Sequence, residues 1–185
     1  MGYTIRMRQH LCVFFLFLVL FSYSFFSCEK HAAHIPSDKT TLHIDQGDEE
    51  LTAIAKYARD TLPVFIRHML RPAKGEDNFR VKYPFRANRG SGFSMEQLWL
   101  SDIMYKDGVY YGTVSNDPFY VDSLKKGDTI ALNIEDITDW MYTSGEKIIG
   151  GRSIKYLLNQ LSEHTKEQQI IMKMLSDSPD FEETN

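Results

Sequence analysis

Four acidic side chains have the type and distribution that could support catalysis: Glu96, Asp117, Asp136 and Asp139. Glycoside hydrolysis needs two carboxyl groups that face one another across the substrate. A small hydrolase or glycan-active enzyme that uses paired carboxylates is therefore one interpretation of the chain. The other interpretation is structural, because Asp117 stands in an Asn-Asp-Pro turn and the acids around Ile137, which include Asp136 and Asp139, would be exposed groups between buried apolar residues.

The sequence contains no motif that is typical of other kinds of catalysis. The sequence has no nucleophile elbow, zinc-binding helix motif, phosphate loop or dinucleotide fingerprint. No cysteine follows Cys28, which excludes thiol catalysis in the part beyond it. His31 and His34 lie in a polar segment, where binding a metal ion would cost the entropy of ordering flexible ligands. We expect no metal site and no cofactor.

Aromatic residues concentrate in the region that we interpret as strands. Strand aromatics usually pack in a core, but Trp and Tyr also anchor binding partners. Successive side chains of a strand alternate between its faces, so Trp140, Met141 and Tyr142 cannot all point to one core unless a helix covers the second face. We take Trp99, Asp139, Trp140 and Tyr142 as a candidate binding surface.

The amino-terminal segment has the features of an export signal. Arg6 and Arg8 precede an apolar run over residues 11–26, and Phe25-Phe26-Ser27-Cys28 resembles a bacterial lipobox. The run is roughly 16 residues long, short of the ~20 that span a bilayer comfortably. We expect residues 1–27 to be a signal peptide and Cys28 to be lipid-modified. An uncleaved anchor and ordinary signal cleavage are the two alternatives.

Charge and length limit the class of partner. The chain has 185 residues, enough for one domain with a flanking element. Removing residues 1–27 removes two of the 21 basic residues and none of the 25 acidic ones, which leaves a net charge of −6. This balance argues against nucleic acid as a partner. The expected partners are a membrane, reached through the lipid on Cys28, and an unknown envelope protein or glycan. The expected location is the bacterial cell envelope, with the domain in the periplasm or at the cell surface.

Hydrophobic periodicity gives the order of the elements. Residues 28–47 form a polar tether, and a helical stripe then runs from Asp48 to Leu70, with a kink or restart expected near Pro63. Strand-like alternation follows from Phe79 to Ile149, and Lys106-Asp107-Gly108 gives the strongest hairpin signal. Ser153 could cap a last helix, in which His164-Thr165 is a candidate break, and residues 177–185 form an acidic tail.

This order predicts a single α+β domain over residues 48–176. Its amino-terminal helix precedes an antiparallel curved sheet or small open barrel of four to five strands, and a carboxy-terminal helix follows the sheet.

Six stretches in the strand region and the start of the last helix resemble the bacterial family called domain of unknown function 2314. They run in order over roughly residues 76–160. Gln97 departs from the family pattern, which often has His at that position. The resemblance implies a compact α+β domain and supplies no activity, because the family is uncharacterised. The stretches are Phe79-Arg80-Val81-Lys82-Tyr83-Pro84-Phe85, Glu96-Gln97-Leu98-Trp99-Leu100, Gly112-Thr113-Val114-Ser115-Asn116-Asp117-Pro118, Leu124-Lys125-Lys126-Gly127-Asp128, Ile137-Thr138-Asp139-Trp140-Met141-Tyr142 and Gly150-Gly151-Arg152-Ser153-Ile154.

Overall fold

The computed structural model describes residues 48–88, 90–92 and 94–175. The predicted signal peptide, Cys28, the tether and the acidic tail lie outside these residues. In the described part of the chain, no helix is long and apolar enough to cross a membrane.

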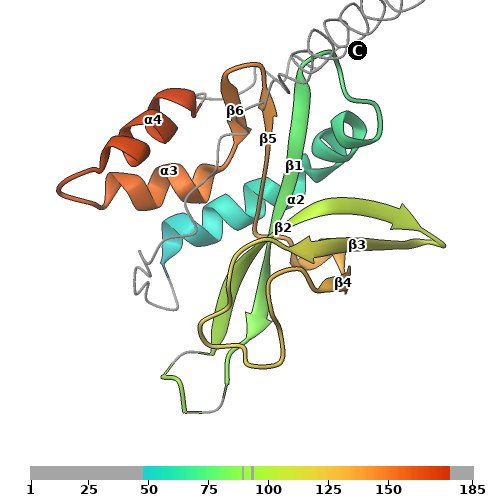
Figure 1. The fold of residues 1–185 in the computed structure, drawn as a ribbon, viewed down its shortest axis with the longest axis horizontal. Helices are drawn as coiled ribbons and strands as arrows, with labels where there is room; N and C mark the ends of the chain where they lie inside the picture. The colour runs from blue at the N-terminus through green and yellow to red at the C-terminus, as the bar shows by residue number, and fades with distance from the viewer. Residues whose placement is uncertain (1–47, 89, 93, 176–185) are drawn as a thin grey trace, which may run out of the picture. The chain divides into compact units, whose positions relative to one another are not determined.

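The chain folds as α+β, as the sequence predicts. The elements in chain order are α2 (Glu49–Leu70), β1 (Glu76–Arg86), β2 (Met95–Lys106), β3 (Val109–Val114), β4 (Thr129–Leu132), the 3-10 helix η2 (Ile134–Asp136), β5 (Asp139–Ser144), β6 (Lys147–Gly150), α3 (Arg152–Asn159) and α4 (Lys166–Met174) (Figure 1). The strands number six, one more than the upper estimate, because the segments on both sides of the turn at Gly145 pair with each other.

All six strands belong to one open sheet in the order β4-β3-β2-β1-β5-β6. Every neighbouring pair is antiparallel. The central pairing of β1 with β5 joins segments that lie far apart in the sequence. Two irregularities interrupt the ladders, one between Asp77 and Arg80 and one between Ser101 and Met104. Each contains an Asn or Asp with positive φ, Asn78 and Asp102, which are residue types that tolerate this conformation.

Helix α2 covers one face of the sheet. Asp48 caps it by accepting a hydrogen bond from the Leu51 backbone N–H at 3.1 Å. Pro63 lies on its exposed side, and the helix continues through it as one element, so the restart expected there does not occur. Solvent can satisfy the backbone carbonyl that loses its donor at this exposed position.

The main core lies between α2 and the sheet. Ala58, Leu62 and Phe65 from the helix pack with buried residues of the strands: Val81, Leu98, Leu100, Val114, Leu132, Trp140, Tyr142 and Ile149. The Phe65 and Trp140 rings have centroids 5.5 Å apart, and the Trp140 indole N–H donates to Thr61 Oγ1 at 3.1 Å. Trp140 therefore points toward α2. Tyr142, which also belongs to β5, points the same way and stacks on His68 of the helix.

The carboxy-terminal helical region consists of two helices, with the break at His164-Thr165 that the sequence allows. Thr165 is the N-cap of α4 and forms a capping box with Gln168. Figure 1 shows α3 and α4 beside the β5–β6 end of the sheet. Met141 and Ile148 are buried there, and Ile148 forms an isolated bridge with Leu175. The second face of β5 is thus covered as well.

Candidate functional site

The pairing of three central strands assembles a polar cluster on the sheet face opposite α2. Lys82 of β1 lies directly across from Trp99 of β2 and from Asp139 of β5. Directly paired residues share a face of the sheet, so the three side chains are neighbours. Ser153, in the first turn of α3, completes the cluster.

Asp139 is the buried acid of this cluster, with an exposed fraction of 2%. Its carboxylate accepts hydrogen bonds from the Trp140 backbone N–H at 2.8 Å and from the Ser153 backbone N–H at 2.7 Å. Burial raises the pKa of Asp139, while hydrogen bonds from Ser153 and the charge of Lys82 oppose this change. The carboxylate is therefore held in place by one backbone donor of β5 and one in the first turn of α3.

Ser153 is not the N-cap that the sequence predicts. Gly151, with φ +67°, occupies the N-cap position and supplies no side-chain acceptor, so Asp139 of β5 takes over this role from a neighbouring element. Ser153 is 3% exposed and its Oγ accepts a hydrogen bond from Lys82 Nζ at 3.1 Å. Its hydroxyl thus lies between the cation and the buried acid.

Lys82 is half-buried, and its Nζ lies 5.7 Å from the centroid of the Trp99 ring. Burial lowers the pKa of Lys82, and the charge of Asp139 offsets part of this shift. The contact with the indole is a cation–π interaction, which partly compensates a cation that has lost water. In the polar cluster, the negative charge of Asp139 balances the positive charge of Lys82. The Lys82 side chain itself is only half-buried.

Arg80 adds a second cation on the same face, two residues before Lys82. It is half-buried, and no carboxylate of the described residues lies within 4.0 Å of its guanidinium. Burial lowers its pKa, and the charge of Asp102 offsets part of the effect. Guanidinium remains protonated at physiological pH, so this group is a charge whose donors are available to a ligand.

The structure corrects the candidate binding surface. Asp139, Trp140 and Tyr142 are 2%, 2% and 4% exposed and cannot contact a partner as surface residues. The reason is that helices cover both faces of β5. This is the one arrangement in which alternation along a strand still leaves all three residues buried. Trp99 alone remains half-exposed.

The candidate carboxylates Glu96, Asp136 and Asp139 have separate hydrogen-bond partners. Glu96 accepts hydrogen bonds from the backbone N–H groups of Phe119 and Tyr120 at 2.8 and 2.7 Å. Asp136 accepts from the Tyr83 hydroxyl at 3.3 Å and from the Asn133 side chain, and Asp139 lies in the polar cluster. Asp117 is exposed. Each of the first three stabilises a turn or a helix start. Asp136 is exposed, as the structural interpretation expects, whereas Asp139 is buried, which corrects that interpretation.

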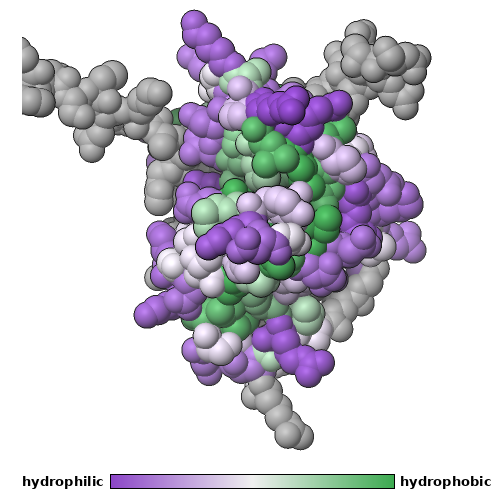
Figure 2. Space-filling view, turned by 90° about the vertical axis from the view of Figure 1, so that its right-hand side faces the viewer, coloured by the Kyte–Doolittle hydropathy of each residue, from purple (hydrophilic) through white to green (hydrophobic). Residues whose placement is uncertain are grey.

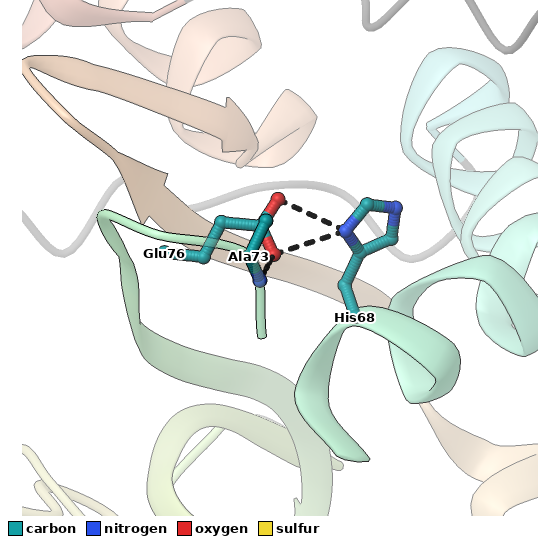
Figure 3. A network of polar contacts seen from close by, with 3 residues as sticks. All are labelled: His68, Ala73 and Glu76. Atoms are coloured by element: carbon teal, nitrogen blue, oxygen red, sulfur yellow. Dashed lines mark hydrogen bonds and ion pairs between the residues drawn. The ribbon is translucent and has the colours of Figure 1, made fainter. Parts of the chain in front are cut away.

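A contact between His68 and Glu76 has no counterpart in the sequence patterns. His68 Nδ1 lies 2.9 and 3.1 Å from the two carboxylate oxygens of Glu76, which also accepts the Ala73 backbone N–H at 2.8 Å (Figure 3). The His68 ring stacks on Tyr142 with centroids 5.4 Å apart. The hydrogen bonds of Glu76 therefore join the end of α2 to the start of β1. Within the described residues, no group of three metal-ligating side chains occurs.

Few sequence signals could have found the polar cluster. Lys82 alternates with apolar residues, which is typical of a solvent-facing position, and only the long-range pairing of β1 with β5 brings it to Asp139. The Gly150-Gly151 pair is the usable signal, because a Cβ on Gly150 would lie 2.2 Å from the Trp140 carbonyl oxygen. The lack of a side chain at Gly150 thus lets its backbone lie close to Trp140, directly before the start of α3.

The polar cluster gathers residues from four of the six stretches that carry the family resemblance. An open antiparallel sheet with a helix over its core face, and a cluster of half-buried Lys82 with buried Ser153 and Asp139 at a helix start, define a compact α+β domain. The chain belongs to the bacterial family described as "Uncharacterized protein conserved in bacteria (DUF2314)", whose model matches residues 48–173.

Two curated relatives extend this finding. The chain is 40% identical over 103 residues to the "Uncharacterized protein YegJ" of Escherichia coli strain K12, covering 56% of this chain and 63% of that protein. It is 29% identical over 136 residues to the "Putative ankyrin repeat protein NMB1133/NMB1171" of Neisseria meningitidis serogroup B, covering 71% of this chain and 53% of that protein. The chain thus spans less than two thirds of either relative. No solved structure matches it.

Proposed function

We propose that this protein is a membrane-tethered, non-catalytic binding module of the bacterial cell envelope, with its domain in the periplasm or at the cell surface. Its ligand surface consists of Arg80, Lys82 and Trp99, which we name the cation–indole surface. The observation that carries the proposal is that these three half-exposed side chains share one sheet face, while the candidate acids Glu96, Asp136 and Asp139 hold structural elements.

The chemistry of this surface favours an acidic glycan as the ligand. A flat indole offers an apolar face on which a sugar ring can stack, and Trp is a frequent anchor of binding sites. Arg80 has a planar fork of donors that matches a carboxylate, and Lys82 adds charge beside the indole. A neutral glycan would leave the Arg80 guanidinium without a contacting carboxylate, because Asp139 balances the charge of Lys82 only.

One contact favours a hydrolase instead. Lys82 Nζ lies 3.1 Å from Ser153 Oγ, and a lysine of lowered pKa can activate a serine nucleophile. Ser153 is 3% exposed, however, and Asp139 occupies the adjacent helix start. A substrate carbonyl would have to displace this packing. We therefore assign the contact to the structure of the binding module, and a fluorophosphonate probe should not label Ser153.

The tether is tested by incorporation of a labelled fatty acid into the wild-type protein and a Cys28→Ala variant, followed by membrane fractionation. Label in the wild type alone supports lipidation at Cys28. Absence of label from both, with both in membranes, would indicate an uncleaved anchor. Recovery of both in the soluble fraction would contradict the proposed tether.

The ligand surface is tested by fluorescence, because the chain has two tryptophans and Trp140 is buried. Acrylamide quenching therefore reports mainly on Trp99. Polygalacturonate, an acidic glycan, should protect Trp99 from acrylamide, whereas neutral dextran should not. Arg80→Gln should weaken the protection, and Arg86→Gln, at an exposed arginine of the same strand and face, should retain it. Equal protection by both polymers, or equal effects of both variants, would contradict this ligand assignment.

A further inference from the structure

The β2–β3 hairpin has apolar side chains on both faces of its tip. Tyr105 pairs with Tyr110 on the face toward the core, with ring centroids 4.7 Å apart. Met104 pairs with Tyr111 on the opposite face. Tyr105 and Met104 are 56% and 52% exposed, and Val109 at the end of the hairpin is 36% exposed. This is an unusual concentration of exposed apolar groups for one turn of a soluble surface.

The tip extends beyond the strand that flanks it. Strand β4 pairs only with residues 110–113 of β3, so among the described residues no strand flanks the turn residues Lys106, Asp107 and Gly108 on that side. Asp107 and Gly108 have φ values of +52° and +83°, which are the positive values that a two-residue hairpin turn needs. A tight turn therefore holds the apolar side chains in fixed positions.

The core-side face of the tip continues into an apolar hollow at the end of α2. Ile66 and Met69 of the helix line this hollow together with Ile103 and Tyr110 of the hairpin. Figure 2 views the molecule from the side toward which the hairpin points in Figure 1, and it shows a hydrophobic band flanked by hydrophilic side chains. The apolar lining of the hollow thus adjoins the core-side face of the hairpin.

We infer that the tip of the β2–β3 hairpin inserts into the surface of a lipid bilayer. A flat protein partner can cover only one face of a hairpin, whereas a bilayer interface surrounds an inserted tip and covers both. Tyrosine is enriched at the membrane–water interface, where its ring is buried and its hydroxyl stays hydrated. Lys106 can extend its ammonium group to the headgroups. Because Lys106 and Asp107 balance in charge, insertion does not require anionic lipids.

This inference rests on the proposed tether for its local concentration of lipid. The 20 residues from 28 to 47 can extend to at most about 70 Å, so a domain held at Cys28 can turn its hairpin toward the same membrane. The lipid on Cys28 would be the first contact with the membrane and the hairpin the second. Because the tether makes the second contact intramolecular, the inserted state would be populated even if insertion by itself is weak. The domain would then lie on the membrane in one orientation.

The test uses the full chain in a Cys12→Ser background, reconstituted in phosphatidylcholine vesicles. An environment-sensitive fluorophore is attached through Asp107→Cys at the hairpin tip and, in a second protein, through Glu163→Cys between α3 and α4. The tip fluorophore should shift its emission to the blue and lose intensity with doxyl-labelled lipids. The fluorophore at position 163 should do neither.

A matched pair of variants identifies the cause of the shift. Replacing Met104, Tyr105 and Val109 by serine should abolish both signals, whereas Ile170→Ser, which removes a similarly exposed apolar group of α4, should retain them. A tip fluorophore as hydrated as the one at position 163 would overturn the inference. So would a blue shift that needs added envelope protein instead of lipid. A second set of proteins that also carries Cys28→Ser, added to vesicles from solution, reads the insertion without a lipid anchor and without a second thiol, so failure of the tether and failure of the insertion are distinguishable.

Discussion

The Asp139 carboxylate on β5 accepts a hydrogen bond at 2.7 Å from the backbone N–H of Ser153 in the first turn of α3. A strand residue thus supplies the acceptor that the N-cap Gly151 lacks. The same carboxylate balances the charge of Lys82, which donates to Ser153 Oγ. One side chain therefore fixes the start of a helix and its position against the sheet, and it opposes the lowering of the pKa of the neighbouring lysine by burial.

Removing this carboxylate should be strongly destabilising. In Asp139→Ala two backbone N–H groups lose their charged acceptor and Lys82 loses a nearby opposite charge, and buried donors left without a partner cost about 1–3 kcal/mol. Urea unfolding measures this loss. Asp139→Ala combined with Lys82→Met should lose less than the sum of the two single variants, since the unpaired cation is gone. Asp117→Asn, an exposed acid, should change stability by no more than about 0.5 kcal/mol. Additive effects in the double variant would contradict the coupling.

The backbone at Gly150 lies so close to Trp140 that a side chain at this position should destabilise the domain. Gly150 has φ +80°, and a Cβ there would lie 2.2 Å from the Trp140 carbonyl oxygen, closer than real Cβ contacts come. Gly127 has φ +94° with nothing within 4 Å. Gly127→Ala should therefore cost only the left-handed conformation, about 1–2 kcal/mol. Gly150→Ala should cost clearly more because β5 or α3 must move, and thermal unfolding compares the two. Equal losses would show that the close approach has no energetic role.

The fold class follows from local patterns, but the site depends on distant pairings. Alternation and the Asp107-Gly108 signal predict the hairpin, and its turn has the positive φ values that the signal requires. The same alternation assigns Lys82 to solvent, although β1 pairs with β5 and brings this residue to Asp139. Periodicity reports which residues share a face, but it does not report which later element covers that face.

Trp140 and Tyr142 illustrate the same limit. Their alternation with Met141 predicts an exposed residue, yet α2 packs on one side of β5 and the other side is buried beside α3 and α4. Only a strand in the interior of the sheet, covered on both faces, explains three consecutive large buried side chains. The strand order, with β5 between β1 and β6, is the fact that local patterns do not contain.

Glu96 should act as a structural clamp rather than as an acid catalyst. Its two carboxylate oxygens accept the backbone N–H groups of Phe119 and Tyr120, 23 and 24 residues further along the chain. Glu96→Ala should increase hydrogen exchange at these two amides and lower stability by about 1–3 kcal/mol, the cost of losing acceptors with a full charge. Glu135→Ala, at an acid of the η2 turn, is the control. Unchanged exchange at residues 119 and 120 would contradict the clamp.

Tyr142 should make the stability of the domain fall at alkaline pH. Burial, together with the nearby charge of Glu76, raises the pKa of Tyr142 to about 12. The unfolded chain releases this proton near pH 10, whereas the folded chain keeps it until about pH 12. The contribution is therefore complete below pH 10 and is lost as the pH rises toward 12. A shift of this size corresponds to on the order of 2 kcal/mol, after allowance for the part of the side chain that solvent screens.

The measurement is the free energy of unfolding of wild type and Tyr142→Phe at several pH values from neutral to alkaline. Tyr83 and Tyr156 also have raised pKa values, so both proteins should lose stability in alkali. The wild type should lose more, because the phenyl ring of the variant has no proton to release in either state. Tyrosinate absorbance should show one more group ionising late in the wild type than in the variant. Parallel stability curves for the two proteins would mean that the Tyr142 hydroxyl ionises as freely in the fold as in the unfolded chain.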